Sequence, residues 1–116
     1  MRARLYATLA DLTDAAQIPA LSQQWKDAKA DAPAILALYE SWLYDCLCAS
    51  QGATILNGDF RAQIAKQAAR RSAGRWLNLF DALIAARNQL KNNVSWQWVW
   101  DKLLFAIVEG VDEWPR

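Results

Sequence analysis

Residues 31–50 read DAPAILALYESWLYDCLCAS and carry the clearest helical signal in the chain. Asp31 followed two positions later by Pro33 is typical of a helix N-cap and first turn. Apolar residues then recur at helical spacing and cover one half of a helical wheel: Ile35, Leu36, Leu38, Tyr39, Trp42, Leu43, Cys46 and Leu47. A helix with one apolar side needs neighbouring helices to cover that side, so the stretch predicts a helical bundle.

The same periodicity recurs on both sides of this stretch. Further helices are predicted over about residues 2–12, 14–28, 59–69, 72–91 and 95–109. Their predicted N-caps are Asp14, Asp59, Ser72 and Ser95. We therefore expect an all-α fold: a single compact bundle of about six helices, ordered over about 2–110, within one domain spanning 1–116. Gly110 stands where a helix-terminating glycine belongs, and residues 111–116 are expected to form a loose tail.

The composition supports helices over strands. The 22 alanines and 15 leucines far outnumber the 13 valine, isoleucine and threonine residues. A hydrophobic content of 54% with a net charge of only +1 excludes a disordered chain. The apolar runs are too short to cross a bilayer, so no membrane association is expected.

Several classes of chemistry are excluded by the residues that the sequence lacks. There is no histidine, no P-loop, no glycine-rich dinucleotide motif and no nucleophile elbow. Cys46 and Cys48 point away from each other on a helix and lack two further ligands for zinc. We expect no enzyme activity, no cofactor, no metal and no small-molecule substrate, and a reduced, cytoplasmic protein.

One basic cluster lies in the middle of the chain, formed by Arg61, Lys66, Arg70, Arg71 and Arg75. Such a cluster can contact phosphates, but no aromatic residue interleaves to stack on bases, and the net charge is nearly zero. The pattern favours a solvated helix face or an acidic protein partner, and no direct contact with nucleic acid is expected.

Arg87 lies in the apolar arc of its predicted helix, where a charge is costly unless it is paired. Two arrangements satisfy it. The guanidinium pairs with Asp45, at the edge of the apolar arc of residues 31–50, or the Arg87 stem covers the core while its charged head reaches water.

The last predicted helix gives the strongest indication of function. Its inner side is formed by Trp96, Trp100, Leu103, Leu104 and Ile107. The opposite side carries Trp98 and Phe105, bordered by Asp101 and Lys102. A helix that is apolar on both sides is buried on both sides, and tryptophan is enriched at interfaces. We expect these four outer residues to form a partner interface; the alternative is a central helix wrapped by the other five.

Four segments, in this order and spacing, resemble the C-terminal helical domain of the delta prime subunit of the bacterial DNA polymerase III clamp loader. They are LSQQW (21–25), WLYDCL (42–47), LIAARNQL (83–90) and DKLL (101–104). The asparagine-rich turn and Ser95 before the last helix also fit. The tryptophan-rich stretch 96–100 departs from the family, which usually has aliphatic residues there.

The resemblance implies a non-enzymatic collar domain that holds a pentameric clamp loader together during DNA replication. The implied partners are the other clamp-loader subunits. The family's zinc site and its nucleotide-contacting arginine lie in an ATPase-like module that this sequence does not contain. Two alternatives stay open: an unrelated helical protein-interaction scaffold, and a nucleic-acid-binding bundle acting through residues 61–75.

Overall fold

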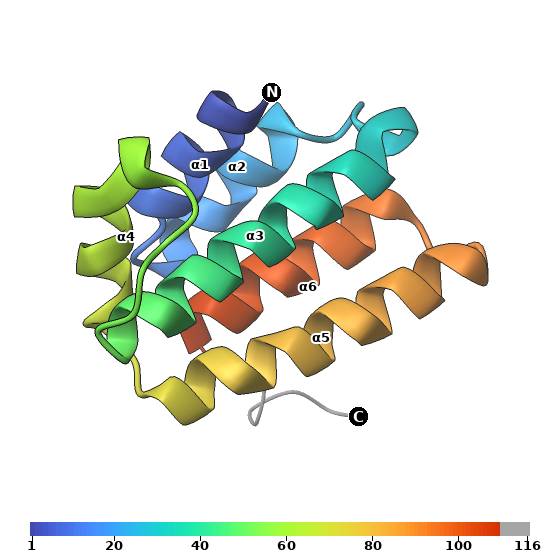
Figure 1. Cartoon of the computed structure of the whole chain (residues 1–116). Helices are drawn as coiled ribbons and strands as arrows, with labels where there is room; N and C mark the ends of the chain where they lie inside the picture. Colours follow the sequence, from blue (N-terminus) through green and yellow to red (C-terminus); the bar gives the residue numbers. More distant parts are fainter. Residues whose placement is uncertain (110–116) are drawn as a thin grey trace.

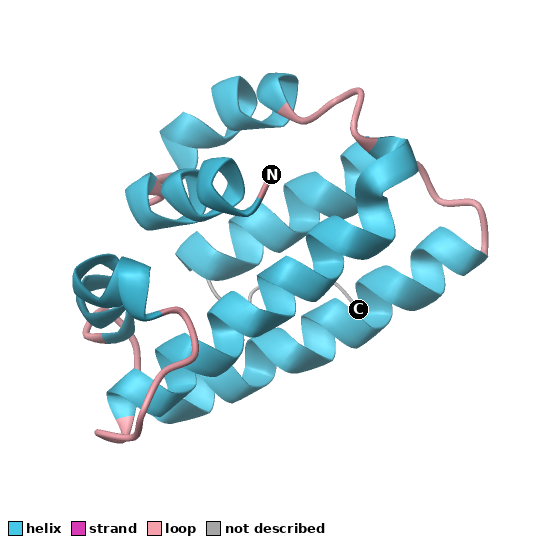
Figure 2. Cartoon of the chain, turned by 45° about the horizontal axis from the view of Figure 1, so that its top comes forward, coloured by secondary structure: helices cyan, strands magenta, loops and turns pink. Residues whose placement is uncertain are grey.

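The computed structural model describes residues 1–109, which form helices and their connections with no strand among them (Figures 1 and 2). The expected all-α bundle of about six helices is therefore confirmed. The helices are α1 (Arg2–Asp11), α2 (Ile18–Gln24), α3 (Ala32–Ser50), α4 (Arg61–Ala68), α5 (Ala73–Lys91) and α6 (Trp96–Glu109). Short 3₁₀ turns precede α2, α3 and α4, at Ala15–Gln17, Lys29–Asp31 and Gly58–Phe60. Gly110 and the expected tail at 111–116 lie outside the described residues.

The three long helices α3, α5 and α6 run alongside one another, and α1 and α2 lie together against them (Figures 1 and 2). The short helix α4 packs against α3 and contacts α1. The side chain of Gln67 on α4 secures the end of α1, since its Nε2 lies 3.0 Å from each of the carbonyl oxygens of Leu9, Ala10 and Leu12. The last carbonyls of a helix lack donors from a following turn, so this buried amide supplies hydrogen-bond donors at the end of α1.

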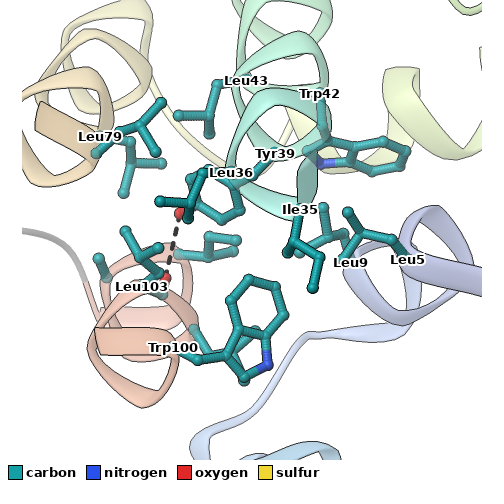
Figure 3. Close-up of a cluster of buried hydrophobic side chains, with 14 of the residues drawn as sticks. Leu5, Leu9, Ile35, Leu36, Tyr39, Trp42, Leu43, Leu79, Trp100 and Leu103 are labelled. Carbon is teal, nitrogen blue, oxygen red and sulfur yellow. Dashed lines mark hydrogen bonds between the residues drawn. The ribbon is translucent and has the colours of Figure 1, made fainter. Parts of the chain in front are cut away.

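Large aromatic side chains fill the centre of the bundle. Trp42, Trp76 and Trp100 are fully buried, together with Tyr6 and Tyr39. Figure 3 shows Tyr39 of α3 reaching α6, where its hydroxyl donates to the carbonyl of Leu103 at 3.2 Å. Burial raises the pKa of the Tyr39 hydroxyl, so it remains a proton donor. This bond ties α3 to α6 across the core.

The predicted N-caps are partly confirmed. The Asp14 carboxylate accepts from Ala16 N, and the hydroxyls of Ser72 and Ser95 accept from Arg75 N and Trp98 N. Asp31 is the N-cap residue of α3, as predicted, but its side chain makes no capping hydrogen bond.

Asp59 is wrong as the cap of α4. It lies inside the 3₁₀ turn before that helix, and its carboxylate binds Arg2 at 2.6 Å. This hydrogen-bonded ion pair holds the pKa of Asp59 below its ordinary value.

The two cysteines are free thiols, as expected. Cys46 is buried in the core and Cys48 is half-buried on the same helix. Burial, with the nearby charge of Asp45, raises the pKa of the Cys46 thiol to about 12. Among residues 1–109, no helix is long and apolar enough to cross a bilayer.

Candidate assembly surface

The inner side of α6 is buried as predicted. Trp96, Trp100, Leu103, Leu104 and Ile107 are each at most 3% exposed. The indole of Trp96 stacks on that of Trp100, with ring centroids 5.4 Å apart and an angle of 17° between the planes. Trp96 Nε1 also donates to the carbonyl of Trp25 at 2.8 Å, which fastens α6 to the end of α2. The tryptophan-rich stretch thus has a structural role on its inner side.

The outer side of α6 presents Trp98, which is 57% exposed and is therefore not wrapped by the other described helices. Lys102 follows one turn later, and its Nζ lies 5.6 Å from the centre of the Trp98 ring. A cation over an indole face is an attractive contact that limits where the ring can turn. Trp98 is thus an exposed aromatic side chain held against its own helix.

The two remaining candidates on this side are less exposed than Trp98. Phe105 is partly buried and packs against the core cluster. Asp101 is partly buried as well, and its Oδ1 is a buried atom without a hydrogen-bond partner in the described part of the chain. Trp98 is consequently the large apolar side chain that α6 offers to a partner.

The expected ion pair between Asp45 and Arg87 is wrong. Arg87 Nη2 instead lies 2.9 Å from Glu40 Oε1, and both side chains are about 40% exposed, at 40% and 43%. Arg87 therefore reaches the boundary of the bundle, where a glutamate of α3 meets it. The guanidinium is thus paired with a carboxylate other than the expected one and remains partly hydrated.

Asp45 is fully buried and binds the connection between α3 and α4. Its Oδ1 accepts from Leu56 N at 2.7 Å, and its Oδ2 accepts from Asn57 N at 2.8 Å and from Asn57 Nδ2 at 2.6 Å. This role was not predicted from the sequence. Two features of the sequence indicate this role: Asp45 is an acidic residue at the edge of an apolar arc, and an Asn-Gly pair follows in the next loop.

The members of the basic cluster differ in how far they are buried. Lys66 and Arg70 are exposed, whereas Arg71 is partly buried and its guanidinium carbon lies 5.6 Å from the centre of the Trp76 ring. Burial lowers the pKa of Arg71, and the nearby charges of Arg75 and Arg70 lower it further. Arg71 is thus partly buried beside neighbours of the cluster that are exposed.

Exposed apolar residues on α3 and α5 were not predicted either. Leu77 and Ile84 lie seven residues apart on α5 and are 54% and 57% exposed, and Tyr44 on α3 is 46% exposed. The spacing of Leu77 and Ile84 indicates a shared side of α5, because residues seven apart lie on one side of a helix.

The described residues define a small all-α bundle domain with an exposed tryptophan on its last helix. Residues 1–108 match the family model described as DNA polymerase III, delta subunit, C terminal, and the chain belongs to this family. The expectation of a C-terminal domain from a clamp-loader protein is thereby confirmed, without a distinction between delta and delta prime. Comparisons with curated proteins and with solved structures found no match.

Proposed function

We propose that this domain is the collar domain of a DNA polymerase III clamp-loader subunit, delta prime, and that it holds the pentameric loader together during replication. The family match supports a clamp-loader subunit, and the four sequence segments that resemble delta prime support the narrower assignment. The domain acts by binding other subunits and performs no chemistry of its own.

The observation that carries the proposal is the exposure of Trp98 on a helix whose inner side is buried. Burying an indole that is more than half exposed contributes about 2–3 kcal/mol of binding free energy. The stacked and hydrogen-bonded inner side fixes α6 in place, so little conformational entropy is lost when a partner binds. Trp98 therefore has the properties of a central contact in a subunit interface.

Lys102 and Asp101 complete the surface by adding one charge of each sign beside Trp98. Charges at the rim of an interface select partners and speed association more than they add affinity. We assign the partner surface to Trp98, Asp101, Lys102 and Phe105, with Trp98 supplying most of the apolar contact.

Co-purification tests this function. The chain, carrying an affinity tag, is mixed with the remaining clamp-loader subunits in the absence of DNA and nucleotide, and the complex is resolved by size-exclusion chromatography. We expect a stable assembly that contains the chain. Elution of the chain as a monomer, while the other subunits assemble among themselves, would show that it is not a collar domain.

A further inference from the structure

Two hollows lie beside α4, the helix at the left of Figure 1. The first lies between the end of α3, α4 and the start of α5, and the second lies between the end of α3, the loop that follows it and α4. They have volumes of about 370 and 360 Å³ and share Ala49 and Ala65 in their walls. Arg71 lines the first hollow and Arg61 lines the second. α6 lines neither of them, so they are distinct from the surface around Trp98.

Arg71 has no counter-charge in the described part of the chain. The two ion pairs found there, Arg2 with Asp59 and Arg87 with Glu40, do not use it. Its Nη1 is buried and has no hydrogen-bond partner. A partly buried guanidinium with unused donors is unfavourable, because it has lost water without gaining an acceptor.

The surroundings of Arg71 favour an anion. α5 begins at Ala73, directly beside the hollow, and the start of a 19-residue helix carries partial positive charge. Arg70 and Arg75 are close enough to depress the pKa of Arg71 through their charges. An anion beside Arg71 therefore gains from several positive groups at once.

The walls of the hollow distinguish between kinds of anion. Five of its eight lining residues are alanines, and no aromatic ring lines it. Methyl groups suit the short aliphatic stem of an acidic side chain, whereas single-stranded nucleic acid binds through stacking platforms that are missing from this lining. The net charge of +1 also gives little general attraction to a polyanion.

We propose that Arg71 and the alanine-walled hollow beside it bind an acidic side chain of a partner protein. The carboxylate binds the Arg71 guanidinium where that group lines the hollow, and its stem lies against the alanines. None of these residues belongs to α6. The proposed contact at Arg71 can therefore be tested independently of the function proposed for Trp98.

The test measures binding of fluorescein-labelled hexaglutamate to the 116-residue chain by fluorescence anisotropy at physiological salt. Arg71→Gln removes the charge, and we expect it to weaken binding by about tenfold or more. Ala69→Leu keeps every charge but fills the hollow with a larger exposed side chain, and we expect a similar loss. The matched controls are Lys66→Gln, a cluster residue that lines neither hollow, and Ala62→Leu, an exposed α4 alanine that lines neither. Each control should change binding by less than about twofold.

Thermal melts by circular dichroism establish that each variant is folded, and Ala69→Leu tests the hollow without disturbing the contact between Arg71 and Trp76. The proposal is overturned if hexaglutamate does not bind, if Lys66→Gln weakens binding as much as Arg71→Gln, or if Ala69→Leu binds normally. It is also overturned if a thymidine oligonucleotide of equal charge binds more tightly than hexaglutamate and loses affinity with the same two variants.

Discussion

Asn57 binds Asp45 through both its backbone amide and its side-chain amide, at 2.8 and 2.6 Å from the same carboxylate oxygen. Asp45 lies on α3, and Asn57 directly precedes the 3₁₀ turn that leads into α4. Arg2 of α1 also reaches this connection, where its guanidinium donates to Asn57 Oδ1 at 3.2 Å and to Asp59. One buried carboxylate therefore holds together the connection on which α1, α3 and α4 converge.

Asp45→Ala should destabilise the domain by about 3 kcal/mol, because it leaves the amide donors of Leu56 and Asn57 without their acceptor. Urea denaturation measures the change in the free energy of unfolding. Asp81→Ala, which removes an exposed carboxylate on α5, serves as the control and should cost less than about 0.5 kcal/mol. A loss below about 1 kcal/mol for Asp45→Ala would contradict the role assigned to this residue.

Arg87→Ala should cost less than about 1 kcal/mol, since its ion pair with Glu40 is partly exposed and screened by solvent. A double-mutant cycle between Asp45 and Arg87 should be additive within about 0.5 kcal/mol, because the two side chains have different partners. A coupling energy well above 1 kcal/mol in that cycle would restore the pair expected from the sequence.

The stability of the domain should fall as pH rises above about 9. The buried Cys46 thiol has a pKa of about 12 in the folded chain against a reference value of 9.0, so the unfolded state loses its proton first. Between these values the folded state binds more protons, and stability decreases by at most about 1.4 kcal/mol per pH unit for this group. Urea denaturation at pH 8, 9 and 10 should show a shallower decrease for Cys46→Ala than for the unmodified chain. Equal slopes for the two proteins would refute this.

Local periodicity was sufficient to predict most of the fold. The apolar stripe of 31–50 and the inner side of α6 follow from helical spacing, which depends only on near neighbours in the chain. The caps at Ser72 and Ser95 follow from the same local chemistry. For this reason, helical spacing alone distinguishes the inner side of α6 from its outer side.

Pairings between distant residues were not predictable in this way. α3 carries two acidic residues, Glu40 and Asp45, and the packing of α3 against α5 determines that Arg87 pairs with Glu40. The partial burial of Arg71 depends on how α4 and α5 enclose the turn between them, which no local pattern encodes. Contacts of this kind can be predicted only once the packing of the helices is known.

The two sides of α6 should respond differently to truncation. Trp100→Ala removes a fully buried indole and should cost about 3–5 kcal/mol of folding stability. Trp98→Ala removes an exposed indole and should leave the melting temperature nearly unchanged. Phe105→Ala should fall between them, because that ring packs partly against the core. Thermal melts of the three variants, followed by circular dichroism, check this order, and unfolding of Trp98→Ala would make α6 a central helix.

The affinity of the chain for the other clamp-loader subunits, measured with Trp98→Ala and with Leu77→Ala, tests the assembly surface most directly. Leu77 is the matched control, being an exposed apolar residue on α5 rather than α6. Both variants are compared with the unmodified chain by surface plasmon resonance. We predict that Trp98→Ala raises the Kd about 30-fold, which corresponds to about 2 kcal/mol, and that Leu77→Ala changes it less than about twofold. A Kd for Trp98→Ala within about twofold of the unmodified chain would contradict the assignment of the assembly surface to α6.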